Sequence, residues 1–189
     1  NIIGELHGNV VEPISDIRRE LWASLDAPID SAPLCRRVTP GSTVALVVSD
    51  MSRFWMRQDL VVPHLVDYLT QRCGVGESDI TIVIANGTHT GGDEAELRTL
   101  VTDAVYDRIT VENHNCDSDD LVYLGTTPHG TPVSIYCTAA EADLVVCLGA
   151  VTHHVMAGFG GGRKSILPGI SGRETIFHNH AFSLDAAQL

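Results

Sequence analysis

Three short, almost continuous runs of apolar residues constrain the fold of this chain more than any other feature. They cover residues 43–49 (TVALVVS), 80–85 (ITIVIA) and 143–149 (DLVVCLG). A run of this length, rich in β-branched residues and bounded by Gly or Asp, is typical of a strand whose two faces are both covered. The sequence therefore predicts strands that lie inside a sheet with helices on each side.

Segments with helical periodicity separate these runs. Residues 14–25 place their apolar side chains on one helical face, and residues 93–101 do the same. Residues 58–73 also predict a helix, which Pro63 starts or kinks because proline lacks the backbone N–H of a helix interior. The strands at 43–49 and 80–85 are thus each followed by a helix.

Two weaker strand candidates cover residues 109–113 and 132–136. Strands that alternate with amphipathic helices indicate the α/β class, here a Rossmann-like, doubly wound and mostly parallel sheet. We expect residues 1–189 to form a single domain, because this length suffices for one well-buried core.

Polar residues follow each strong strand at the point where it ends. Asp50 follows the first strand, the turn Asn86-Gly-Thr-His89 follows the second, and a long loop from Ala150 follows the third. In open α/β sheets, ligands bind beyond the carboxyl ends of the strands. The sequence therefore predicts that a binding site forms from these three segments.

The charge balance excludes some partners. The chain has 24 acidic and 12 basic residues and a formal net charge of -12. Nucleic-acid binding needs a positive field that displaces counterions, so we expect no nucleic-acid partner. No stretch approaches the roughly 20 apolar residues of a membrane helix, so we expect no membrane partner either.

The cysteines and the N-terminus predict a cytoplasmic protein. The five cysteines are odd in number, widely spaced and without a CxxC pair, a pattern that favours reduced thiols over a disulfide or zinc framework. The first residues lack the basic cluster and apolar core of a signal peptide.

A glycine-rich loop near the C-terminus is the sharpest local motif. Gly160, Gly161 and Gly162 permit positive φ angles and let backbone N–H groups approach a ligand, and Lys164 and Ser165 follow at once. A phosphate would fit between these amides, the ammonium group and the hydroxyl. The motif differs from a P-loop, because an arginine replaces its second glycine and Pro-Gly stops the helix that should follow.

Histidines flank this loop on both sides. His153 and His154 precede it and His178 and His180 follow it, so four of the nine histidines fall within 28 residues. A flexible loop with incidental basic residues is the alternative interpretation. We favour a functional cluster, because imidazole serves both proton transfer and nickel or zinc ligation.

These motifs together resemble the N-terminal domain of the lactate racemase family. The resemblance covers the chain from about residue 5 to its end, and the Gly-Arg-Lys-Ser-Ile-Leu-Pro-Gly segment with histidines on both sides is its most specific part. The matching pieces are Asp50-Met-Ser-Arg53, Asn86-Gly-Thr-His89, His153-His154, Gly158-Phe-Gly-Gly-Gly-Arg-Lys164-Ser-Ile-Leu-Pro-Gly169 and His180.

The resemblance implies a nickel-pincer nucleotide, pyridinium-3,5-bisthiocarboxylic acid mononucleotide, as cofactor. Lys164 would hold this cofactor covalently, and His180 would ligate its nickel. His89 and His154 would be the two acid–base residues, with His154 preferred over His153 for its spacing to the lysine. The other residues implied in cofactor binding are Asp50, Met51, Ser52, Arg53, Gly160, Gly161, Gly162 and Ser165.

The same resemblance implies an isomerase that acts on a small 2-hydroxy acid. Reversible hydride transfer to the cofactor would interconvert the stereoisomers, and Arg53 would lie close to the substrate carboxylate. Cofactor-synthesis proteins are the implied partners. Members of the family are about twice as long and carry a second domain, so we expect the 189 residues alone to be weakly active or inactive.

Two other functions stay open from the sequence alone. A P-loop-like phosphotransferase would bind ATP and Mg²⁺ at Lys164 without needing nickel. A non-catalytic module would retain nickel or the nucleotide without turnover. Single residues also have structural alternatives: Asp50 would cap the next segment, and His89 would be a turn residue.

Overall fold

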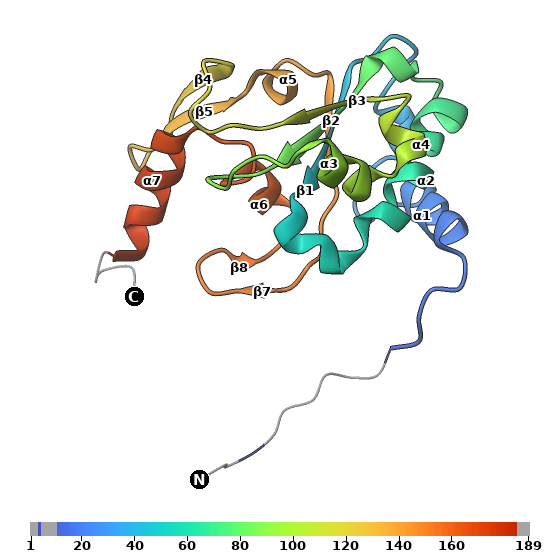
Figure 1. The fold of residues 1–189 in the computed structure, drawn as a ribbon, viewed down its shortest axis with the longest axis horizontal. Coiled ribbons are helices and arrows are strands. Elements are labelled where there is room, and N and C mark those ends of the chain that lie inside the picture. Colours follow the sequence, from blue (N-terminus) through green and yellow to red (C-terminus); the bar gives the residue numbers. More distant parts are fainter. Residues whose placement is uncertain (1–3, 5–10, 185–189) are drawn as a thin grey trace.

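The first apolar run forms strand β1 (Val44–Ser49), which lies in the interior of a four-stranded parallel sheet. The computed structural model describes residues 4 and 11–184. The order is β3-β2-β1-β6, where β2 is Ile80–Ala85, β3 is Thr110–Asn113 and β6 is Leu144–Cys147. This sheet confirms the predicted α/β class and parallel, Rossmann-like architecture (Figure 1).

Successive side chains of β1 enter two different cores, which explains why the run is apolar at every position. Val44, Leu46 and Val48 belong to one buried cluster, whereas Ala45 and Val47 belong to a second cluster on the opposite face. A strand with only one covered face would alternate between apolar and polar residues.

Four helices cover the first face of the sheet and group on one side of Figure 1. They are α1 (Ile17–Asp26), α2 (Val62–Asp67), α3 (Glu94–Val101) and α4 (Asp103–Tyr106). The predicted helix at 58–73 begins as the 3₁₀ turn Gln58–Leu60, becomes α2 near Pro63 and ends as the π turn Tyr68–Arg72. Proline near its start confirms the predicted irregularity.

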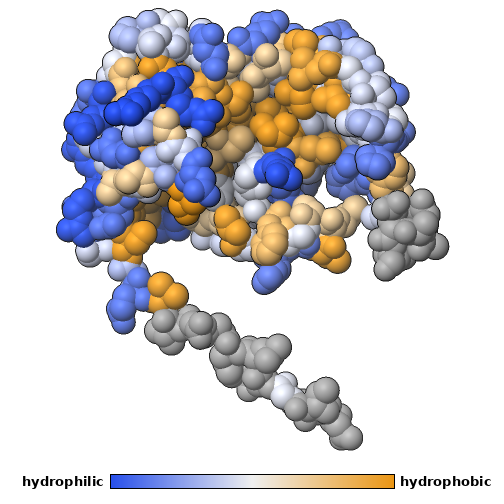
Figure 2. All heavy atoms as spheres, turned by 180° about the vertical axis from the view of Figure 1, so that it is seen from behind, coloured by the Kyte–Doolittle hydropathy of each residue, from blue (hydrophilic) through white to orange (hydrophobic). Residues whose placement is uncertain are grey.

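The second face is covered by shorter elements. These are the hairpin β4 (Leu121–Thr126) and β5 (Pro132–Tyr136), with α5 (Cys137–Ala140) and α6 (Arg163–Ile166). The sequence predicted β5 but not its partner β4, in which no residue is fully buried. Seen from behind, apolar side chains gather over the middle of the molecule (Figure 2).

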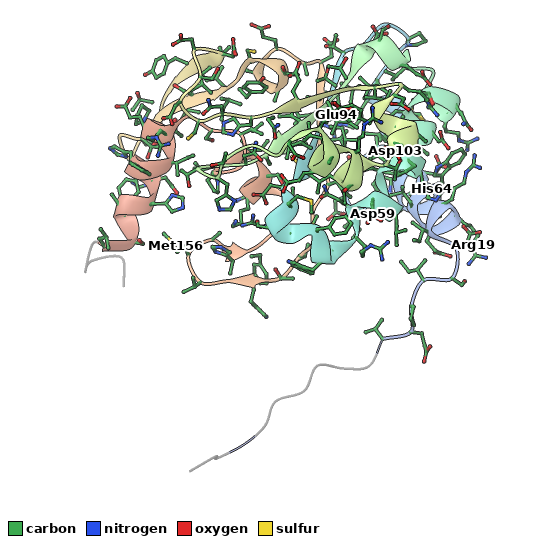
Figure 3. The ribbon with its side chains drawn as sticks, viewed as in Figure 1. Arg19, Asp59, His64, Glu94, Asp103 and Met156 are labelled. Carbon is green, nitrogen blue, oxygen red and sulfur yellow. A yellow bond between two sulfur atoms is a disulfide. The ribbon has the colours of Figure 1, made fainter. Side chains whose placement is uncertain are left out.

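The chain after β6 forms a second, small hairpin before it reaches the last helix. Its strands are β7 (His153–His154) and β8 (Gly158–Phe159), and its tip carries Met156 (Figure 3). Helix α7 (Arg173–Ala181) then runs into the 3₁₀ turn Phe182–Leu184. Sequence periodicity did not predict this hairpin, because two-residue strands have no measurable pattern.

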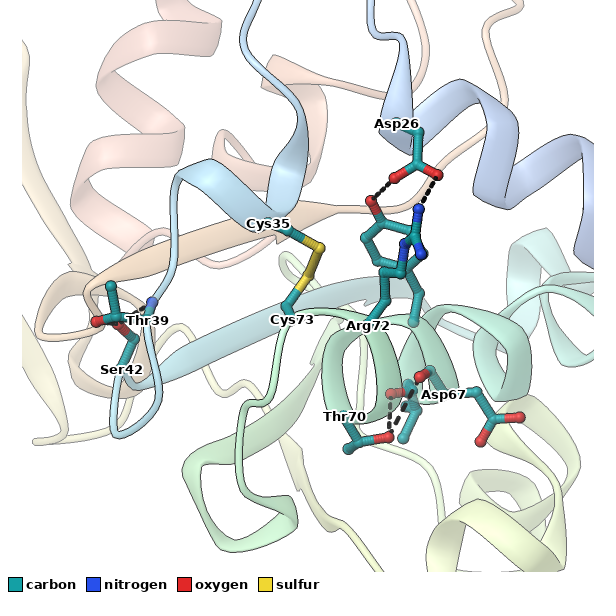
Figure 4. Close-up of a disulfide and its surroundings, with 10 residues drawn as sticks. Asp26, Cys35, Thr39, Ser42, Asp67, Thr70, Arg72 and Cys73 are labelled. Carbon is teal, nitrogen blue, oxygen red and sulfur yellow. Dashed lines mark hydrogen bonds and ion pairs between the residues drawn. A yellow bond between two sulfur atoms is a disulfide. The ribbon is translucent and has the colours of Figure 1, made fainter.

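A disulfide between Cys35 and Cys73 corrects the prediction that all cysteines are reduced (Figure 4). Cys35 lies in the 3₁₀ turn Leu34–Arg36, and Cys73 follows the π turn, 38 residues later, at a Cα–Cα distance of 4.7 Å. The prediction was wrong for this pair because only packing brings the two turns together. The other three cysteines are free.

Among residues 4 and 11–184, no helix is long and apolar enough to cross a membrane. Disulfides are typical of oxidising compartments and rare in the cytosol. The cytoplasmic location therefore stays a prediction.

Candidate functional site

The carboxyl ends of β1 and β2 and the loop after β6 meet around a small cleft of about 80 Å³. This is the place that the sequence predicted for a ligand. The cleft brings together the turn after β2 with Lys164 and Arg53. It is lined by Ser49, Arg53, Ala85, Asn86, Gly87, Thr88, His89, Gly161, Lys164, Ser165, Pro168 and Gly169.

Asp50 and His89, from two different strand ends, contact each other at this edge. Nδ1 of His89 lies 2.5 Å from Oδ2 of Asp50. The Asp50 carboxylate is nearly buried, whereas the His89 side chain is 52% exposed. A carboxylate accepts hydrogen bonds, so Nδ1 carries the proton and Nε2 keeps a free lone pair. His89 is thus arranged as a proton acceptor.

The other Asp50 oxygen holds the next residues of the same segment. Oδ1 accepts from the hydroxyl of Ser52 at 2.6 Å and from a guanidinium nitrogen of Arg53 at 3.3 Å. Asp50 precedes the 3₁₀ segment Met51–Met56, but its side chain makes no capping bond there. Met51 packs against the apolar core instead of facing the cleft.

A network of asparagines fixes the loop that carries His89. The N–H of His89 donates to the carbonyl of Asn86 at 2.9 Å, which closes the turn. Nδ2 of Asn86 donates to Oδ1 of Asn113 and to the backbone carbonyl of His114. Asn113 in turn exchanges two hydrogen bonds with the backbone of Gly92. Asn113 was not among the predicted site residues, because its only signal in the sequence is its place at the end of a weak strand.

Lys164 is the only lysine in the 189-residue sequence, and it lies in this cleft. Partial burial lowers the pKa of its ammonium group, and the positive charge of Arg53 lowers it further, whereas Asp50 acts in the opposite direction. Both lowering effects disfavour the charged form. The amine is therefore a better nucleophile than an exposed lysine at the same pH.

The glycine-rich loop packs tightly against the end of β6. A Cβ at Gly149 would lie 3.0 Å from the Cα of Gly161, and a Cβ at Gly161 would lie 3.0 Å from the Ala150 carbonyl. The N–H of Gly160 donates to the Thr152 carbonyl at 2.7 Å. To bind a phosphate, the N–H of Gly160 would have to give up its hydrogen bond to Thr152. Phosphate binding by Gly160, Gly161 and Gly162 therefore stays a prediction.

The hydrogen bonding of Nδ1 in His154 is the opposite of that in His89. Nδ1 of His154 accepts hydrogen bonds from the N–H groups of Met156 and Ala157 at 3.2 and 3.1 Å. The neutral ring therefore carries its proton on Nε2. The pKa of His154 is lowered by partial burial, then by the charges of Lys164, Arg53 and His180 in turn. These charges therefore act on His154, although neither His154 nor His180 lines the cleft itself.

His180 is the histidine to which the family resemblance assigns the nickel. It lies in the last turn of α7, and its Nδ1 is 2.7 Å from the carbonyl of Ile176. A ring nitrogen that donates to a carbonyl leaves the other nitrogen free for a metal. His178, two residues earlier, packs edge-on against Phe182 with ring centroids 5.5 Å apart. His153 packs against Phe159 in the small hairpin.

The structure gives no support to a P-loop phosphotransferase. Helix α6 has four residues, and a hairpin separates it from β6. A P-loop instead joins a strand directly to a long helix whose N-terminus holds the phosphates.

Comparison with known proteins decides the family. The family model described as the lactate racemase N-terminal domain matches residues 1–188. The chain belongs to the lactate racemase family. This confirms the resemblance carried by the glycine-rich loop and the residues around it.

Two lactate racemases illustrate the relationship. The enzyme of Lactiplantibacillus plantarum is 33% identical over 159 residues, which are 84% of this chain and 37% of the relative. The enzyme of Thermoanaerobacterium thermosaccharolyticum is 32% identical over 158 residues, 83% of this chain and 36% of the relative. The chain thus spans less than two fifths of these lactate racemases.

Solved structures agree with the family. The lactate racemase apoprotein of Thermoanaerobacterium thermosaccharolyticum aligns with a TM-score of 0.75 and 28% identity, over 85% of this chain and 38% of that chain. A Thermotoga maritima protein aligns with a TM-score of 0.63 and 19% identity, over 87% of this chain and 40% of that one, and shows the fold alone.

Proposed function

We propose that this chain is the cofactor-binding part of a racemase or epimerase that acts on a small 2-hydroxy acid and uses a nickel-pincer nucleotide tethered to Lys164. One observation carries the proposal. The only lysine of the sequence, with a lowered pKa, lies in the same cleft as Arg53 and His89. Membership in the lactate racemase family supports the reaction class.

The donor chemistry of the described residues fits such a cofactor. Lys164 offers an amine for the covalent link, and His180 offers Nε2, with Nδ1 already held by a carbonyl. Imidazole nitrogen suits nickel. Residues 4 and 11–184 contain no cluster of three or more His, Cys, Asp or Glu side chains that would hold a metal unaided. A single histidine ligand therefore needs further donors from the cofactor.

When bound, the cofactor supplies an electron-poor acceptor for hydride, and the protein supplies position and proton transfer. The guanidinium of Arg53 binds the substrate carboxylate through parallel hydrogen bonds. Nε2 of His89 accepts the proton of the substrate hydroxyl. His154 holds a proton on Nε2, from which it can donate a hydrogen bond to the carbonyl oxygen of the 2-keto acid.

The cofactor is a nucleotide that the protein chain cannot itself supply. Cofactor-synthesis proteins therefore make it and load the site. Full activity requires the longer chain that the curated relatives have, of which this sequence spans 36 to 37%. The substrate is lactate or another small 2-hydroxy acid.

Intact-mass spectrometry tests the tether. The longer protein would be produced together with the cofactor-synthesis enzymes, and the mass of the wild type would be compared with those of Lys164→Arg and His180→Ala. We expect a nucleotide-sized adduct in the wild type and in His180→Ala, which loses nickel, and none in Lys164→Arg, which keeps the positive charge. An adduct that survives Lys164→Arg would overturn the proposal.

A further inference from the structure

We infer that Asp50 is a positioning residue, which fixes the tautomer of His89 and holds the guanidinium of Arg53 beside it. The inference rests on the proposed function, in which His89 accepts a proton and Arg53 binds a carboxylate. The contact between the Asp50 carboxylate and the His89 ring is the observation that carries it.

The sheet register brings the two residues together. Strands β1 and β2 are parallel neighbours in which Ser49 pairs with Ala85, so Asp50 and Asn86 both lie just beyond the same edge. The tight turn closed by the Asn86 carbonyl then reverses the chain and returns His89 toward Asp50. Two strand ends thus supply one acid–base pair, although 39 residues separate its members.

Both oxygens of the Asp50 carboxylate have protein partners. Oδ2 contacts His89, and Oδ1 accepts from Ser52 and Arg53. The side chain is only 9% exposed. Three donors on its two oxygens hold the carboxylate in one orientation.

The carboxylate determines which nitrogen of His89 is basic. It cannot donate, so it selects the ring form with the proton on Nδ1 and the lone pair on Nε2. An amide at the same position can turn its NH₂ group toward the ring, which then accepts at Nδ1 and carries its proton on Nε2. That ring form cannot take the substrate's proton at Nε2.

The same carboxylate aligns Arg53. One terminal nitrogen of Arg53 contacts Oδ1 of Asp50 and the hydroxyl of Ser52. The guanidinium has five N–H donors in a fixed fork, so its other edge is free to meet a planar carboxylate through two hydrogen bonds. Asp50 consequently sets the distance between the group that holds the substrate and the group that takes its proton.

The test compares Asp50→Asn with Asp59→Asn in the full-length, cofactor-loaded protein. Asp59 is a matched control, because its carboxylate also pairs with an arginine, Arg57, and lies outside the cleft (Figure 3). We expect Asp50→Asn to lower kcat by roughly 10²–10⁴-fold, the usual contribution of general acid–base catalysis. KM should change less than kcat, and nickel and adduct content should be unchanged. Asp59→Asn should behave as the wild type.

A second readout does not depend on turnover. Nitrogen-15 NMR of protein labelled at histidine distinguishes protonated from unprotonated ring nitrogens. His89 should be protonated at Nδ1 in the wild type, and the form protonated at Nε2 should gain population in Asp50→Asn. An unchanged tautomer, or loss of the adduct from Asp50→Asn, would overturn the inference. Absence of racemisation in the wild type would instead refute the proposed function, and the NMR measurement would still test whether Asp50 fixes the His89 tautomer.

Discussion

The backbone N–H of Gly87 donates a hydrogen bond of 2.9 Å to the carbonyl of Gly169. This bond joins the loop that carries His89 to the segment that follows Lys164. Gly87 has a φ of +58°, and a Cβ there would meet Pro168 at an ordinary 3.7 Å. The two halves of the cleft are therefore held together by backbone in a conformation that favours glycine.

Replacing this glycine should affect both stability and function. Gly87→Ala places a side chain at positive φ, which costs roughly 1–2 kcal/mol. Gly41→Ala is the matched control, since Gly41 also has a positive φ, has open space around it and lies outside the cleft. Urea unfolding should show similar losses for both variants, whereas only Gly87→Ala should reduce turnover of the loaded protein. Equal turnover in the two would refute a role for this bond.

The reactivity of Lys164 should depend on its two charged neighbours in opposite ways. The positive charge of Arg53 lowers the pKa of Lys164 and the negative charge of Asp50 raises it. Arg53→Gln should therefore slow acylation of the amine at pH 8, and Asp50→Asn should accelerate it. Because the sequence has one lysine, peptide mapping after a short pulse of an acylating reagent measures this site directly. Changes of the same sign in both variants would contradict the prediction.

Buried His114 should make the protein less stable in acid. Its ring is almost fully buried and neither ring nitrogen has a partner within the described residues. Loss of hydration lowers its pKa to about 4. The folded-state pKa lies below the unfolded value of about 6.5, so the unfolded state takes up the proton first as the pH falls. The free energy of unfolding should decrease between about pH 6.5 and pH 4, by roughly 3 kcal/mol.

The variant His114→Phe isolates this contribution. A phenyl ring keeps the edge-to-face contact with Tyr136, whose centroid lies 5.7 Å away, and has no titratable group. Urea unfolding at pH 7.5 and pH 4.5 should show a smaller acid loss for the variant than for the wild type. Equal losses of unfolding free energy in the two proteins would mean that His114 does not cause the acid sensitivity.

The Cys35–Cys73 disulfide should stabilise the fold without taking part in the reaction. It closes a segment of 38 residues around β1 and the helix that follows, which should contribute roughly 2–4 kcal/mol. Dithiothreitol should lower the urea midpoint of the wild type and leave that of the double variant Cys35→Ala, Cys73→Ala unchanged. If dithiothreitol leaves the urea midpoint of the wild type unchanged, the disulfide is absent in solution.

The apolar runs by themselves determined the sheet. Residues 43–49 and 80–85 are apolar at nearly every position, which is typical of strands covered on two faces, and the helices between them indicated the parallel α/β class. The glycine-rich loop with its lysine and the histidines around it likewise identified the family, because local residue order carries that motif.

Only the tertiary structure decided how these groups act on one another. The pairing of Asp50 with His89, the opposite ring tautomers of His89 and His154, and the disulfide all join or orient groups through contacts that residue order does not encode. Such contacts depend on sheet register, turn geometry and the packing of short segments. A shift of one residue in register would turn each side chain to the other face of the sheet.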